Sequence, residues 1–209
     1  MSQLIKIAPG PTDRAMFVGS TGTGKTHLML NQAEHFYGVK QIQILNTKSD
    51  SGINELDVPN LTSIDELPQY TFPEYPVVVY TPSGEELADL QNLDDWCNWC
   101  YARRNTHAII DEITQLGNGT YPKMGLLNLA TRGRDRNVSA FYGTQRPVGV
   151  PKIIYTESQH FYKFYLADLD DRKAIAKYTH PSMIHQAWDQ HGFHYYKVGS
   201  RKVFYIKGL

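Results

Sequence analysis

Residues 19–26 match the complete pattern G-x-x-x-x-G-K-T, whose residue types and spacing suit the binding of a phosphate chain. In such a loop, successive backbone N–H groups turn inward around the anion, and the following helix adds the positive end of its dipole. The Lys25 ammonium can reach the β- and γ-phosphates, and the Thr26 hydroxyl can hold Mg²⁺. The pattern therefore predicts a site for ATP and Mg²⁺. The residues expected to bind the nucleotide are Gly19, Ser20, Thr21, Gly22, Thr23, Gly24, Lys25 and Thr26.

The residues around this loop supply the elements that it needs. Residues 15–18 form a short apolar run typical of a buried strand, and residues 26–33 open a helix. Gly22 and Gly24 permit backbone angles and close approaches that a Cβ atom would block. A glycine-rich turn that happens to precede a helix is the alternative interpretation. Because strand, helix, Lys and Thr are all present, their combination favours nucleotide binding.

Two acids follow a second apolar run, residues 107–110. In enzymes with such a phosphate loop, an Asp at this point helps to hold Mg²⁺ through its water shell, which predicts that role for Asp111. The adjacent Glu112 is then placed to orient and deprotonate an attacking water. A kinase needs no such acid, so Glu112 favours hydrolysis over phosphoryl transfer to a metabolite. Many strands end in acidic turns, and the prediction gains its weight from the phosphate loop.

A third strand, expected over residues 139–144, delivers Gln145 at its carboxyl end, where ligands of open α/β sheets collect. Gln145 could contact the γ-phosphate or the attacking water. Three arginines precede this strand: Arg132, Arg134 and Arg136. Their simplest interpretation is a solvated helix end, whose dipole favours cations.

The strand followed by Thr144-Gln145-Arg146-Pro147, with Arg134 eleven residues before Gln145, resembles the FtsK/HerA superfamily of DNA-translocating ATPases. The resemblance covers roughly residues 14–165 and extends to a further strand within residues 158–166. It implies that Arg134 acts as an arginine finger across a subunit boundary, although Arg132 and Arg136 are near enough to take that role instead.

Within the superfamily, this short chain looks like the genome-packaging ATPases of double-stranded DNA viruses. The resemblance implies a RecA-like P-loop ATPase that forms a homo-oligomeric ring, a hexamer or a pentamer, and moves double-stranded DNA into a capsid without reading its sequence. A capsid or membrane-vertex protein is a possible docking partner, and the expected location is the virion or the host cytoplasm.

Two alternatives stay open at this point. The first is a motor of the same superfamily that acts on protein, such as a phage morphogenesis ATPase, although those usually carry a membrane segment. The second is a P-loop kinase or a nucleotide switch that does not hydrolyse its ligand.

Apolar runs that alternate with helical stretches predict an α/β fold: a mainly parallel central sheet with helices on both faces and a C-terminal β-hairpin. We expect one P-loop ATPase motor domain over residues 1–209. The expected strands are 15–19, 41–46, 77–81, 107–111 and 139–144, and the expected helices are 25–37, 84–103, 122–132 and 168–178. Residues 194–198 and 202–206 would form the hairpin.

Composition agrees with an ordinary globular protein, with 41% hydrophobic and 20% charged residues. No apolar run approaches the ~20 residues that span a bilayer, and Lys6, Pro9 and Pro11 stand where a signal peptide would be apolar. The net charge of zero hides an asymmetry: residues 1–104 hold 7 Lys and Arg against 13 Asp and Glu, and residues 105–209 hold 14 against 8. Concentrated positive charge can bind a phosphate backbone.

Two segments are candidates for contact with DNA by their position alone. One is the stretch 115–124 with Lys123, and the other follows Gln145 and contains Arg146 and Lys152. Cys97 and Cys100 superficially resemble a redox C-x-x-C motif, but their spacing within an expected helix predicts core packing instead.

Overall fold

A computed structural model describes residues 7–85, 89–116 and 122–208. Strands in these residues form one nine-stranded sheet in the order β3-β4-β2-β5-β6-β1-β7-β8-β9. The strands are β1 (Arg14–Val18), β2 (Gln41–Leu45), β3 (Asn60–Leu61), β4 (Val77–Tyr80), β5 (Thr106–Ile110), β6 (Ser139–Thr144), β7 (His160–Lys163), β8 (Phe193–Lys197) and β9 (Phe204–Ile206).

The sheet has two parts that differ in direction. In the order of the sheet, all neighbouring pairs from β3 through β7 are parallel. Strands β8 and β9 continue the sheet beyond β7 and pair antiparallel. Every residue of β1, β2, β5 and β6 is buried, as befits parallel strands covered on both faces. The expected mainly parallel sheet with a C-terminal hairpin is therefore confirmed.

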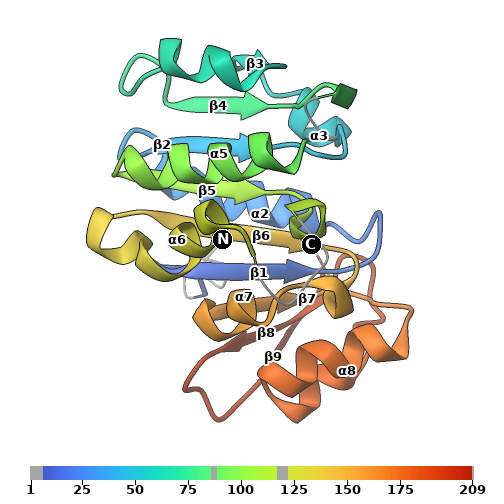
Figure 1. The fold of residues 1–209 in the computed structure, drawn as a ribbon. Helices are drawn as coiled ribbons and strands as arrows, with labels where there is room; N and C mark the ends of the chain where they lie inside the picture. The colour runs from blue at the N-terminus through green and yellow to red at the C-terminus, as the bar shows by residue number, and fades with distance from the viewer. Residues whose placement is uncertain (1–6, 86–88, 117–121, 209) are drawn as a thin grey trace.

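Helices cover both faces of the sheet (Figure 1). The helices are α2 (Lys25–Ala33), α3 (Ser51–Asn54), α5 (Leu90–Ala102), α6 (Met124–Arg132), α7 (Lys152–Glu157) and α8 (Leu169–Tyr178). Leu28 and Met29 of α2 belong to one hydrophobic cluster, and residues of α5, α6 and α7 belong to the other. The sheet thus separates two cores, and α2 lies on the face opposite α5 and α6. No helix in the described ranges has the length and apolar character needed to cross a membrane.

Two expected helices are shorter in the structure than in the prediction. The helix expected over 25–37 ends at Ala33, continues as a 3-10 turn over Glu34–Phe36, and stops before Gly38, whose φ is +74°. The helix expected over 84–103 is interrupted: residues 84 and 85 are helical, Asp89 is extended, and α5 begins at Leu90. The Asp89 side chain accepts a hydrogen bond from the Gln91 N–H (2.7 Å) and so caps the first turn of α5. Residues 86–88 lie outside the described ranges.

Helix α5 explains the two cysteines. Trp96, Cys97 and Cys100 are fully buried in the core beneath this helix. Burial raises the pKa of both thiols well above its ordinary value, so neither forms a reactive thiolate at neutral pH. The interpretation of these residues as packing residues is confirmed.

Asp94 of α5 joins this helix to α6. Its buried carboxylate accepts hydrogen bonds from the backbone N–H groups of Gly125 and Leu126 (both 3.0 Å). These N–H groups belong to the first turn of α6, where no intrahelical acceptor exists, and Lys123 at the N-cap offers no side-chain bond. Asp94 therefore caps α6 from a neighbouring helix.

Asp94→Ala should lower the free energy of unfolding by about 1–3 kcal/mol, because it leaves two buried N–H groups without an acceptor. The matched control is Asp95→Ala, which removes an exposed carboxylate that contacts Gln91 (2.8 Å) on its own helix. That control should change the free energy by less than about 0.5 kcal/mol. Urea unfolding of both variants measures the difference, and equal stabilities would contradict the capping role.

Candidate nucleotide-binding site

The carboxyl ends of three neighbouring strands meet at one edge of the sheet. Strands β5, β6 and β1 are adjacent and parallel, with Val18 opposite Thr144 and Ile110 opposite Tyr142. The residues that follow these strands are therefore neighbours in space, as their parallel arrowheads in Figure 1 indicate. This arrangement brings the phosphate loop, the Asp111-Glu112 pair and Gln145 together.

A cavity of about 270 Å³ lies at this edge. It is lined by Ser20, Thr21, Gly22, Thr23, Gly24, Lys25, Thr26, His27, Lys48, Asp50, Asp111, Gln145 and His191. Gly22 and Gly24 have φ angles of +76° and +91°, in the left-handed region that side chains disfavour. Gly24 directly precedes α2, so the cavity lies at the positive end of this helix.

Lys25 and Thr26 extend from the first turn of α2 toward acidic neighbours. The Lys25 Nζ donates to the main-chain oxygen of Asp111 (3.3 Å), and the Thr26 hydroxyl donates to the Asp50 carboxylate (3.2 Å). Burial lowers the pKa of Lys25, and the nearby carboxylates of Glu112, Asp111 and Asp50 partly oppose this shift. A bound triphosphate would add negative charge and favour the ammonium form further.

The loop after β2 fixes the Asp111 carboxylate. One of its oxygens accepts hydrogen bonds from the Thr47 N–H (3.0 Å) and hydroxyl (2.8 Å), and the other accepts from the Lys48 N–H (3.2 Å). Burial raises the pKa of Asp111, although these hydrogen bonds counteract it. Asp111, Asp50 and Thr26 thus present hard oxygen atoms to one cavity, which is the donor type that Mg²⁺ prefers.

Glu112 is held by three groups. Its carboxylate pairs with Lys48 Nζ (2.6 Å) and accepts hydrogen bonds from the Thr114 hydroxyl (2.8 Å) and the Gln145 N–H (3.1 Å). Burial alone would raise its pKa, but the hydrogen bonds from Lys48, Thr144 and Thr114 outweigh this effect and hold the pKa of Glu112 below its ordinary value. The Glu112 side chain is therefore an ionised carboxylate that is nearly excluded from solvent.

Gln145 connects the end of β6 to the phosphate loop. Its side-chain oxygen accepts a hydrogen bond from the Thr21 hydroxyl (3.1 Å), and its backbone N–H contacts Glu112. One residue therefore contacts both the loop that would enclose phosphates and the acid expected to activate water.

Four residues that line the cavity were absent from the sequence-based prediction: His27, Lys48, Asp50 and His191. Lys48 and Asp50 follow β2, which pairs with β5, so the rule that located Asp111 could also have located them. His191 precedes β8 and packs against Gly24, with its Nδ1 about 3.1 Å from the position a Cβ of that glycine would occupy. No sequence pattern signalled this contact.

The arginines considered for a role across a subunit boundary do not line the cavity of their own subunit. Arg134 belongs to the 3-10 turn Gly133–Arg136, which precedes β6 and so lies at the opposite edge of the sheet. A strand of six residues separates the two edges by about 20 Å. Arg134 therefore cannot reach the cavity of its own subunit.

The three arginines differ in their contacts. Arg132 donates to the Asn128 side chain (3.2 Å), and the Arg136 guanidinium lies 4.4 Å from the ring centroid of Tyr101. Arg134 is exposed, and its side chain makes no hydrogen bond or ion pair with the described residues. Among the three, Arg134 is the one whose side chain has no hydrogen-bond, ion-pair or ring partner in the described residues.

The fold and the cavity define an α/β nucleotide-binding protein of the P-loop class. Comparison with family models gives no match. Among curated proteins, the chain is 25% identical over 172 residues to the DNA packaging ATPase P9 of Enterobacteria phage PRD1, which covers 80% of this chain and 70% of P9.

Solved structures share the fold. The genome packaging NTPase B204 from Sulfolobus turreted icosahedral virus 2, in complex with AMPPCP, superposes with a TM-score of 0.73 at 18% identity and covers 96% of this chain and 100% of B204. VirB4 of Thermoanaerobacter pseudethanolicus superposes with a TM-score of 0.65 at 10% identity and covers 96% of this chain and 91% of VirB4. The similarity to P9 confirms the expected resemblance to viral genome-packaging ATPases, and the solved structures show that the fold is shared.

Gly143 of β6 provides a test of the site geometry. A Cβ at this position would lie 2.3 Å from the main-chain oxygen of Asp111, the atom that contacts Lys25. Gly143→Ala should therefore displace the end of β5, weaken ATP binding and lower the free energy of unfolding by about 1–3 kcal/mol. ATP titration and thermal unfolding measure the two effects.

The control is Gly84→Ala, because a Cβ at Gly84 meets no atom within 4 Å. It should bind ATP as the unsubstituted protein does. Equal ATP affinity in both variants would mean that the contact between Gly143 and Asp111 does not shape the cavity.

Proposed function

We propose that this chain is an ATP-hydrolysing motor that moves double-stranded DNA into a viral capsid. The observation that carries the proposal is the cavity in which a complete phosphate loop faces Asp111, with Glu112 anchored beside it. The similarity to the DNA packaging ATPase P9 supports the choice of DNA as the moved polymer. We take residues 1–209 as one motor domain.

In this proposal the phosphate loop binds and orients ATP. The backbone N–H groups of residues 19–26 surround the phosphates, and the Lys25 ammonium binds the β- and γ-phosphates. Thr26 would hold Mg²⁺ directly and Asp111 would hold it through its water shell, and Asp50, whose carboxylate accepts from the Thr26 hydroxyl, would help to orient that water. When bound, Mg²⁺ neutralises charge on the phosphates.

Glu112 is the proposed general base. It is ionised and nearly excluded from solvent, so it can accept a proton from a water placed at the terminal phosphate. Gln145 would contact the same water or the γ-phosphate, and its hydrogen bonds to Thr21 and Glu112 would report whether that phosphate is present.

Arg134 is the proposed arginine finger, supplied by a neighbouring subunit. Its position at the opposite sheet edge and its free guanidinium support action between subunits rather than within one. A homo-oligomeric ring, a hexamer or a pentamer, repeats this contact around a central channel. Each cavity would then be completed by the next subunit in the ring.

Arg134→Ala should lower the ATPase rate by about 10³–10⁵, the contribution of fingers supplied in trans. Mixing this variant with Lys25→Ala should restore turnover, because a site formed by the intact cavity of one and the intact Arg134 of the other is complete. The control is Arg132→Ala, whose side chain contacts Asn128 of its own helix and should be dispensable. If Arg134→Ala leaves hydrolysis untouched, the finger lies elsewhere.

DNA would be gripped through its phosphates, since a motor must move along any sequence. Arg146 is exposed but pairs with Asp171 (3.0 Å) of α8, which limits its freedom to bind a polymer. Lys152 at the start of α7 is exposed and has no such ion pair in the described structure. Of the other candidate segment, 115–124, residues 117–121 lie outside the described ranges. The expected setting is the virion or the host cytoplasm, with a capsid or membrane-vertex protein as docking partner.

The test is the ATPase rate with and without double-stranded DNA, measured over a protein dilution series. We expect stimulation by DNA of any sequence and a steep loss of activity on dilution, because the site spans two subunits. Glu112→Gln should retain ATP binding and lose turnover. An ATPase rate that is the same with and without DNA would favour the motor that acts on protein. Phosphoryl transfer that is unaffected by Glu112→Gln would favour a kinase.

A further inference from the structure

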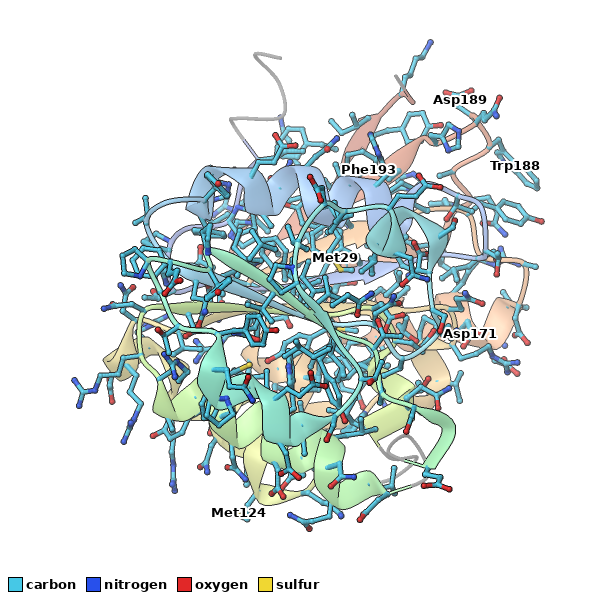
Figure 2. All side chains as sticks on the ribbon, turned by 90° about the horizontal axis from the view of Figure 1, so that it is seen from above. Met29, Met124, Asp171, Trp188, Asp189 and Phe193 are labelled. Carbon is cyan, nitrogen blue, oxygen red and sulfur yellow. The ribbon has the colours of Figure 1, made fainter. Side chains whose placement is uncertain are left out.

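Trp188 is the most exposed large hydrophobic side chain of the described residues, at 77%. The other two tryptophans lie in helix α5, where Trp96 is fully buried and Trp99 is partly buried. Figure 2 shows Trp188 projecting from the rim of the molecule. An exposed indole offers a flat apolar face that a ligand could cover, with a gain in burial.

The loop that carries Trp188 is tied to the segment after β7. Lys163 Nζ donates to the main-chain oxygen of His185 (2.6 Å), and the Gln186 side chain accepts from the Leu166 N–H (3.2 Å) and donates to its oxygen. On the other side of Trp188, the Asp189 N–H donates to the Tyr205 hydroxyl (3.2 Å). The indole is thus exposed on a fixed backbone.

The same segment is joined to the phosphate loop. The Ser20 N–H donates to the main-chain oxygen of Tyr165 (2.9 Å), and the ring of Tyr165 lies 5.6 Å from that of Trp188, centroid to centroid. His191, three residues after Trp188, packs against Gly24 and lines the cavity. Two separate contacts therefore place the aromatic pair beside the loop that would enclose the phosphates.

The order of strands assigns the two sides of the phosphate loop to different parts of a nucleotide. Lys48, Asp111 and Gln145 follow β2, β5 and β6, which all lie on one side of β1. Tyr165 follows β7, and Trp188 precedes β8, on the other side of β1. In the proposed function the acids and Gln145 surround the terminal phosphate, so the rest of the nucleotide would leave the loop toward the aromatic side.

We propose that Trp188, backed by Tyr165, is the platform on which the base of the bound nucleotide stacks. The proposal rests on the proposed function only in that ATP occupies the phosphate loop. Aromatic rings stack on any base through its π-face, so the platform would add affinity for a nucleoside and little selectivity among bases. His191, on the same loop as Trp188, lines the cavity in which the phosphates would bind.

The experiment compares two ligands that share the phosphates and differ in the nucleoside: ATP and inorganic tripolyphosphate. Trp188→Ala should bind ATP about 5- to 100-fold more weakly, the range expected for one base–aromatic stack, while its affinity for tripolyphosphate stays the same. Trp188→Phe should retain most of the ATP affinity because it keeps a ring. In steady-state kinetics the KM for ATP should rise while kcat is kept.

The matched control is Tyr37→Ala, which removes an aromatic side chain that is 62% exposed beyond the far end of α2. It should leave the affinity for both ligands unchanged. Tryptophan emission gives a second readout: ATP should quench the unsubstituted protein, tripolyphosphate should not, and Trp188→Phe should lose the response.

Unchanged ATP affinity in Trp188→Ala would overturn the proposal. Equal weakening of ATP and tripolyphosphate would overturn it too, because Trp188 would then support the loop rather than the base. If tryptophan emission changes on protein dilution but not on addition of ATP, Trp188 lies in a subunit contact and the proposal is wrong. If the unsubstituted protein binds ATP with the predicted quenching but does not hydrolyse it, the proposed motor function fails and the platform stands.

Discussion

The parallel alignment of β2, β5, β6 and β1 is the constraint on which the site depends. Each strand ends at the same edge, and each is followed directly by polar residues. Parallel strands cannot be joined by short turns, so helices that pack on the faces of the sheet connect them. The carboxyl ends of the strands are then left uncovered. A single edge therefore collects a helix N-terminus, two lysines, several carboxylates and an amide from distant parts of the chain.

Buried charges at that edge balance one another. Lys48 pairs with Glu112, and Lys25 lies among Asp50, Asp111 and Glu112. Removing charges from water is costly, and opposite partners with hydrogen bonds offset that cost. The Asp111 carboxylate has a further role, because its bonds to Thr47 and Lys48 join the loop after β2 to the end of β5. The hydrogen bonds that orient the Asp111 carboxylate thus also hold together the two segments that line the cavity.

The sequence predicted the parts of this structure that local patterns encode. The phosphate loop and the strand before it have a strong local pattern, and the acids after β5 were assigned because that loop accompanies them. The alternation of apolar runs with helical stretches predicted the fold class. Asp50, Lys48 and His191 were missed because only sheet order and loop packing bring them to the cavity. The predicted start of α5 was wrong because the extended backbone at Asp89 interrupts the expected helix, and helical periodicity alone does not reveal this break. The choice of Arg134 over Arg132 and Arg136 came from the resemblance, and it stays a prediction.

The most direct measurement is a crystal structure of the chain with a non-hydrolysable ATP analogue and Mg²⁺. We expect the triphosphate within the backbone of residues 19–26, with the Lys25 ammonium on its terminal phosphates and the Glu112 carboxylate facing the γ-phosphate. A triphosphate bound elsewhere, or a Glu112 side chain turned away from it, would contradict hydrolysis at this cavity.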